Sequence, residues 1–223
     1  EKTEKFAFYT NFPQFSILDP ETTYSLPPYQ IACGIADTFV HVIEQYLTET
    51  GVSPLMDRWA EGIMQTLVEV APKVRADQHN YDNMSTYMLS ATMALNGFIA
   101  MGVKLDWATH MIGHELTHGH TLVIVLPALM DVMREQKGDK ILQFGERVFG
   151  IREADRNTGI DRTIRATEEF FRSLGLTTHL SEEKIGRETI DEIARRFEQR
   201  GTKLGEKQNI TGEVARRILE RAL

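Results

Sequence analysis

From residue 27 onward, apolar side chains recur at the three-to-four-residue spacing of helices that bury one face. Prolines stand where such helices would begin, at Pro28 and Pro54, and glycines stand where others would end, at Gly150, Gly175 and Gly201. This pattern predicts a mainly α-helical domain over residues 27–223. The expected helices cover 27–50, 54–67, 82–101, 106–117, 121–135 (interrupted at Pro127), 139–149, 161–174, 187–200 and 211–222.

The first 26 residues have a different pattern. Residues 6–9 and 15–18 are short apolar and aromatic runs, which are typical of strands or extended segments. The sequence also opens without a methionine, in the middle of a pattern. We interpret residues 1–26 as the end of a preceding domain with its connection, and the chain as part of a longer protein.

Composition excludes several classes of protein. The chain has 25 Lys and Arg against 32 Asp and Glu, a net charge of −7, whereas nucleic-acid binding favours a basic surface. No apolar run approaches the roughly 18 residues of a membrane helix. The single cysteine, Cys33, excludes an internal disulfide and fits a reducing compartment. We therefore expect a cytoplasmic protein that binds neither nucleic acid nor membrane.

Histidines concentrate at two places in the sequence. His41 follows Asp37 by four residues, so both side chains share one helix face and can point at one ion. Two or more imidazole nitrogens with one carboxylate suit Fe²⁺ or Zn²⁺. An isolated pair with this spacing is more often a surface or capping pair, and a non-catalytic helical module with structural histidines stays open. The second group is His110, His114, His118 and His120.

A second motif suggests different chemistry. Residues 114–118 read His-Glu-Leu-Thr-His, the pattern of zinc metallopeptidases. In that reading His114 and His118 bind zinc and Glu115 acts as the general base. A third ligand is required downstream, and Glu135 has a suitable separation but no familiar motif around it. A zinc metallopeptidase is thus the alternative hypothesis.

Two longer segments resemble a known family. Residues 16–44 read SILDPETTYSLPPYQIACGIADTFVHVIE, and residues 107–117 read WATHMIGHELT. Both are similar to signatures of the iron-containing (group III) alcohol dehydrogenases, and the second is most similar to the NADPH-linked butanol dehydrogenase and aldehyde reductase branch. The resemblance extends over the whole chain but is loose beyond residue 135. The defining positions of the first signature are Asp19, Pro27, Ala32, Gly34, Asp37 and Glu44.

The resemblance implies a two-domain dehydrogenase that interconverts small alcohols and aldehydes by hydride transfer with NAD(P)H. Residues 1–26 would end the α/β nucleotide-binding domain with short strands, and residues 27–223 would form the helical metal-binding domain. The family's glycine-rich phosphate loop has no counterpart in this chain. The resemblance favours NADP(H) over NAD(H) and a homo-oligomer, a dimer, and we expect these residues to be inactive alone.

Carried over by position, the resemblance implies four ligands of a divalent metal: Asp37, His41, His110 and His118. It places His114 near the nicotinamide and the substrate, as a catalytic and cofactor-binding residue that relays a proton. His110 and His118 stand closer in sequence than in the family signature, by about six residues, which in a helix is about 9 Å and a rotation of about 240°. We therefore expect residues to be missing from the sequence between Thr117 and His118.

Overall fold

The structure is a computed structural model that describes residues 12–116 and 121–223. Within these ranges it is helical and has no strand, only an isolated bridge between Leu204 and Ile210, so the predicted fold class is confirmed. A 3₁₀ helix, η1 (Pro20–Thr23), precedes the helical domain, and a second, η2 (Leu180–Glu183), lies within it. The α-helices are α1 (Pro28–Tyr46), α2 (Pro54–Ala76), α3 (Tyr81–Ala94), α4 (Ala108–Glu115), α5 (Thr121–Val132), α6 (Arg134–Phe149), α7 (Arg156–Ser173), α8 (Arg187–Gln199) and α9 (Gly212–Arg221).

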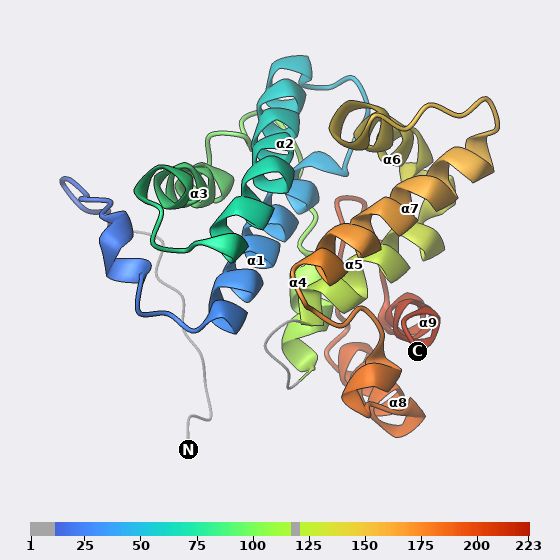
Figure 1. The fold of residues 1–223 in the computed structure, drawn as a ribbon. Coiled ribbons are helices and arrows are strands. Elements are labelled where there is room, and N and C mark those ends of the chain that lie inside the picture. The colour runs from blue at the N-terminus through green and yellow to red at the C-terminus, as the bar shows by residue number, and fades with distance from the viewer. Residues whose placement is uncertain (1–11, 117–120) are drawn as a thin grey trace.

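Helix α5 is the centre of the array (Figure 1). It contacts α1, α4, α6, α7 and α9, and its residues 123–130 are all buried. A helix that is apolar on every side is stable only when other helices surround it. On one side of this centre α2 packs against α1 and α3, and on the other α6 packs against α7 and α8 against α9. Among the helices of the described ranges, none is both long enough and apolar enough to cross a bilayer.

The helix ends follow the local signals. Pro28 and Pro54 occupy first-turn positions of α1 and α2, and Gly150, Gly175 and Gly201 all have positive φ after α6, α7 and α8. At Gly150 φ is 70°, and its N–H donates to the Glu146 carbonyl, 3.1 Å away. Such left-handed termination is a local property, so the sequence alone predicts it.

Other boundaries differ from the expectations. The third helix ends at Ala94 instead of 101, before Asn96 and Gly97, where φ is 83°. Pro127 does not interrupt α5, because one missing N–H costs little beside the burial of the whole helix. Helix α7 begins five residues early, because Asp155 caps it by accepting the N–H of Thr158 at 2.8 Å.

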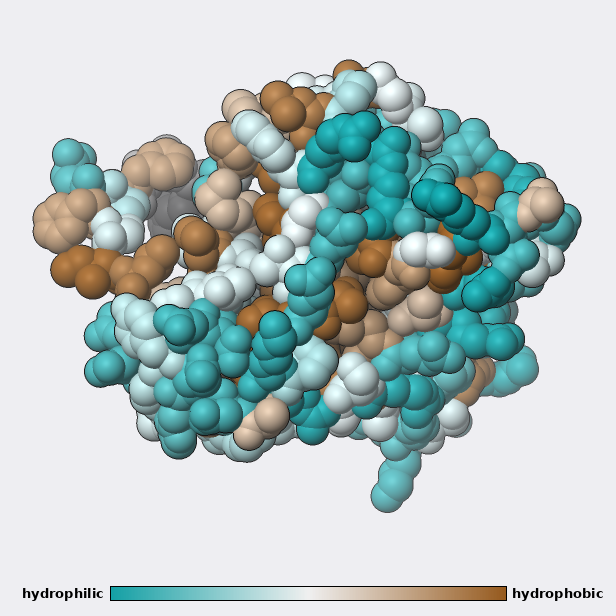
Figure 2. Space-filling view, turned by 45° about the horizontal axis from the view of Figure 1, so that its top comes forward, coloured by the Kyte–Doolittle hydropathy of each residue, from teal (hydrophilic) through white to brown (hydrophobic). Residues whose placement is uncertain are grey.

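The strand expected over residues 15–18 is not formed. These residues are exposed and extend away from the helices, and no strand of the described ranges pairs with them. Phe12, Phe15 and Ile17 are each about four-fifths exposed. Figure 2 shows this projection at the left with brown apolar residues on its surface. The other expected strand, residues 6–9, lies outside the described residues.

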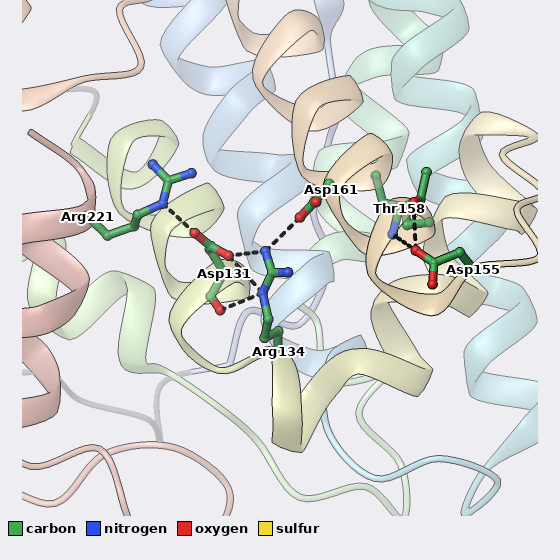
Figure 3. Close-up of polar contacts among 8 residues, drawn as sticks. Asp131, Arg134, Asp155, Thr158, Asp161 and Arg221 are labelled. Carbon is green, nitrogen blue, oxygen red and sulfur yellow. Dashed lines mark hydrogen bonds and ion pairs between the residues drawn. The ribbon is translucent and has the colours of Figure 1, made fainter.

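A polar network ties the C-terminal helices together (Figure 3). Asp131 near the end of α5 accepts from Arg134 Nε at 2.9 Å and also pairs with Arg221 of α9. Arg134 reaches across to Asp161 of α7 at 2.7 Å. Arg134 and Asp131 are partly buried, whereas their pairs with Asp161 and Arg221 are exposed. Exposed pairs are individually worth about 0–1 kcal/mol, so these outer pairs orient the helices more than they stabilise them.

We predict opposite effects of alanine at two helical glycines. A Cβ on Gly145 of α6 would overlap the Thr163 hydroxyl of α7, whereas a Cβ on Gly62 of α2 would meet nothing within 4 Å. G145A should lower the free energy of unfolding by about 1–3 kcal/mol through overpacking. G62A should raise it by about 0.5–1 kcal/mol through helix propensity. Urea unfolding of both variants measures this, and a stable G145A would contradict the close packing of α6 on α7.

Candidate metal centre

Helix α1 presents three polar side chains on one face. Asp37, His41 and Glu44 stand at positions i, i+4 and i+7, which are successive turns of the same stripe. The opposite face of α1 is apolar and packs in the core. Burial of that face therefore directs the three polar side chains toward one place, next to α4.

Helix α4 brings His110 to this stripe. His110 Nε2 lies 3.5 Å from Asp37 Oδ1, and His41 Nε2 lies 3.4 Å from Asp37 Oδ2. The two imidazole rings stack, with centroids 4.1 Å apart and planes 26° apart. One ligand atom from each of these three residues lies within 4.8 Å of the other two. The structure thus brings together three of the four predicted ligands, from positions 73 residues apart in sequence.

Glu44 holds His110 in place from behind. Its carboxylate accepts the His110 backbone N–H at 3.0 Å and also contacts His110 Nδ1. When Nδ1 carries the proton and donates to Glu44, the lone pair of Nε2 faces Asp37 and His41. Carboxylates behind ligating histidines fix the tautomer in the same way. We did not predict this role of Glu44, although its spacing from Asp37 carries the signal.

The charges of the cluster depend on one another. Burial raises the pKa of the Asp37 carboxyl, but the adjacent His110 and His41 imidazoles outweigh burial and hold that pKa well below its usual value. Burial lowers the pKa of His110, whereas Asp37 and Glu44 together raise it to about 9. Burial also raises the pKa of the Glu44 carboxyl, against the opposing effect of His110. The cluster therefore attracts positive charge, and a metal ion and a proton compete for it.

The donors fit a divalent metal ion. His110 Nε2 and His41 Nδ1 are buried and have no hydrogen-bond partner. A buried polar atom without a partner costs free energy, and a cation at His110 Nε2 would remove that cost. One carboxylate and two imidazoles are a ligand set that Fe²⁺ and Zn²⁺ both accept. The Trp107 indole lies edge-on to both imidazoles, at centroid distances of 5.9 and 5.8 Å, and closes one side of the cluster.

His114 lies one helical turn beyond His110. Its ring centroid is 5.9 Å from that of His110, in a T-shaped arrangement, and the residue is exposed. It is therefore next to the cluster and also in contact with solvent. The fourth predicted ligand, His118, lies outside the described residues, as does the junction of Thr117 with His118. Both stay predictions.

The local geometry argues against a metallopeptidase. The motif requires one continuous helix, but α4 ends at Glu115 and Leu116 is extended, with ψ of 147°. The Glu115 carboxylate pairs with Arg196 of α8, at 3.0 Å, and with Arg200, the C-terminal cap of α8. Despite a contrary effect of burial, these guanidinium groups lower the pKa of Glu115. A carboxylate held in this way is a poor general base.

The sequence is similar to a family of metal-containing dehydrogenases, which agrees with a metal site at this cluster. Residues 31–223 match the profile of the Fe-containing alcohol dehydrogenase family, C-terminal. The NADPH-dependent aldehyde reductase YqhD of Escherichia coli is 48% identical over 217 residues, which are 94% of this chain and 56% of that protein. The NADP-dependent alcohol dehydrogenase 3 of Entamoeba histolytica is 41% identical over 193 residues, 84% of this chain and 49% of that protein.

A solved structure agrees with both the fold and the sequence match. The substrate and cofactor-free form of aldehyde reductase YqhD from E. coli superposes with a TM-score of 0.88 at 46% identity, covering 92% of this chain and 56% of that one. The chain belongs to the Fe-containing alcohol dehydrogenase family. It spans about half the length of the relatives it matches.

We predict that D37A removes metal binding and leaves the fold intact. Asp37 contributes the carboxylate of the cluster, and its side chain is half exposed, so its loss leaves no cavity in the core. We expect the affinity for Zn²⁺ to fall more than about 100-fold, because loss of a residue that only hydrogen-bonds to a ligand already costs about 10- to 100-fold. D139A removes an exposed carboxylate on α6 and is the control. Metal analysis after dialysis that finds equal metal in D37A and D139A would refute the site.

We predict that E44Q weakens the metal centre without removing a ligand. A glutamine amide can donate to His110 Nδ1, which favours the tautomer with its proton on Nε2, where the metal would bind. Zn²⁺ affinity should fall about 10- to 100-fold. E61Q is the matched control, since Glu61 is also buried but pairs with Tyr46 and Arg147. Calorimetric titration that finds the same affinity in E44Q as in E61Q would contradict the role of Glu44.

Proposed function

We propose that this chain is the metal-binding part of an NAD(P)H-dependent alcohol dehydrogenase or aldehyde reductase. The reaction is hydride transfer between the nicotinamide and the carbonyl carbon of a small aldehyde, or the reverse from a small alcohol. One observation carries the proposal: Asp37, His41 and His110 converge with ligand atoms within 4.8 Å, on a chain that belongs to a dehydrogenase family.

Fe²⁺ or Zn²⁺ would be held by Asp37, His41 and His110, with His118 as the fourth ligand. Such an ion, when bound, supplies Lewis-acid polarisation of the substrate's carbonyl oxygen. One carboxylate with neutral imidazoles leaves a net positive charge at the site. Asp37 is half exposed and His41 is largely buried, so a substrate approaches from the Asp37 side.

The chain's own residues organise this site. Glu44 keeps the Nε2 lone pair of His110 directed at the cluster, and Trp107 excludes water from one side. His114, exposed one turn away, exchanges a proton between solvent and the oxygen of the alcohol. An imidazole suits this role because its ordinary pKa is near neutral.

The cofactor proposal favours NADP(H). Two of the most similar relatives are named NADPH-dependent and NADP-dependent. The division into residues 1–26, at the end of a nucleotide-binding domain, and 27–223, the helical metal-binding domain, is part of the same proposal. The homodimer and the cytoplasmic location stay predictions.

The test measures NADPH oxidation by the complete protein with a panel of small aldehydes, after chelation and after reconstitution with Fe²⁺ or Zn²⁺. Activity should require the metal and should exceed that with NADH. A metal-free preparation with full activity, or a metal-loaded one with no activity on any aldehyde or alcohol, would contradict the proposal.

A variant of His114 separates its role from metal binding. We predict that H114A retains wild-type metal content and loses about 10²- to 10⁴-fold in kcat, the usual range for a proton-transfer residue. The control is H79A, which removes another exposed histidine in the loop before α3. Wild-type kcat in H114A would exclude the proton relay, and loss of metal would make His114 a ligand instead.

A further inference from the structure

Lys137 of α6 is buried deep in the molecule. It is 1% exposed, and its Nζ lies 2.6 Å from the Leu47 carbonyl, 2.6 Å from Glu206 Oε2 and 2.9 Å from Asp106 Oδ2. The ammonium group donates hydrogen bonds to Leu47 and Glu206 and forms an ion pair with Asp106. Burial of a charge is costly, and removing one partner of such a group is more costly still. The arrangement therefore fixes the three acceptors relative to one another.

Two of these acceptors lie at the ends of the helices that carry the metal centre. Leu47 is the C-terminal cap of α1, which carries Asp37 and His41. Asp106 lies just before α4, which carries His110. Lys137 thus connects the end of one ligand-bearing helix to the start of the other.

Asp106 is itself fixed to both helices. Its Oδ1 accepts the N–H of Ala108, the first residue of α4, at 2.9 Å. Its backbone N–H donates to the carbonyl of Glu44 on α1, at 3.2 Å. A carboxylate at a helix N-terminus satisfies free N–H groups and the helix dipole. His110, two residues after Ala108, is within this first turn, so a shift of Asp106 moves His110.

We propose that Lys137 is a positioning residue of the metal centre. Its ammonium group holds Asp106 against the end of α1, and through Asp106 it holds α4 so that His110 meets Asp37 and His41. The inference rests on the proposed function, since it assigns a purpose to a cluster proposed to bind metal. It requires that loss of Lys137 change the metal site more than a substitution elsewhere that lowers the free energy of unfolding by the same amount.

The chain offers a matched control one turn further along α6. Lys140 is also 1% exposed, and its ammonium pairs with Asp57 of α2 and lies 4.2 Å from the centre of the Tyr46 ring. Its ionic partner is thus on a helix that carries no proposed ligand. K137M and K140M each remove one buried ammonium group; the first takes it from two carboxylates, Asp106 and Glu206, and the second from one, Asp57.

The experiment compares K137M and K140M in the full chain by three measurements: thermal unfolding, Zn²⁺ titration, and hydrogen exchange of the amides at 108–111 without metal. Both variants should lose stability. We expect K137M alone to bind Zn²⁺ about tenfold more weakly and to exchange the His110 amide, which donates to Glu44, at least tenfold faster. Wild-type affinity and exchange in K137M, or equal changes in K140M, would overturn the proposal.

A second variant keeps the test decisive where K137M does not fold. D106N retains an oxygen that can cap Ala108 but removes the negative charge that Lys137 binds. It should weaken Zn²⁺ binding and α4 protection in the same direction, and wild-type values of both would overturn the proposal. If the unaltered chain or D37A shows that no Zn²⁺ site exists, the proposed function fails, while the metal-free exchange still decides whether Lys137 positions α4.

Discussion

The contact between Glu44 and His110 is the interaction on which the rest of the site depends. Two helices far apart in sequence, α1 and α4, meet at this point. The Glu44 carboxylate accepts the backbone N–H of His110 and also contacts its Nδ1. The contact sets where His110 lies and which nitrogen it presents. Because both residues are buried, separating them would leave a buried polar group without a partner, which costs free energy. This cost holds the two helices in the observed geometry.

Around this contact, the helices place three buried charged side chains, those of Glu44, Asp106 and Lys137, close to the ends of α1 and α4. Glu44 and Asp106 end up at the first turn of α4, where the helix dipole favours negative charge. Lys137 forms an ion pair with Asp106, before α4, and donates a hydrogen bond to the Leu47 carbonyl at the end of α1. In contrast, the surface network of Asp131, Arg134 and Arg221 connects helices that carry none of the proposed ligands.

What the sequence predicts well is local. Gly150 ends α6 because only its own backbone is involved, and Asp37 and His41 share a face because helical spacing requires it. The meeting of His110 with that pair is a long-range contact, and it was predicted only through resemblance to a known family. The peptidase motif at 114–118, which was the alternative hypothesis, assumes a helix that in fact ends at Glu115. The burial of Lys137 was not foreseen, since a lysine in an amphipathic helix ordinarily faces solvent.

The most direct test of the metal centre is X-ray absorption at the metal edge of the protein purified with its ion. The geometry predicts a first shell of nitrogen and oxygen at about 2.0–2.2 Å if the ion is Zn²⁺, with the outer-shell scattering of at least two imidazoles, and loss of that imidazole signal in a variant lacking His41 and His110. A spectrum with sulfur at about 2.3 Å, for which Cys33 is the only cysteine source, or one without imidazole scattering, would contradict the account.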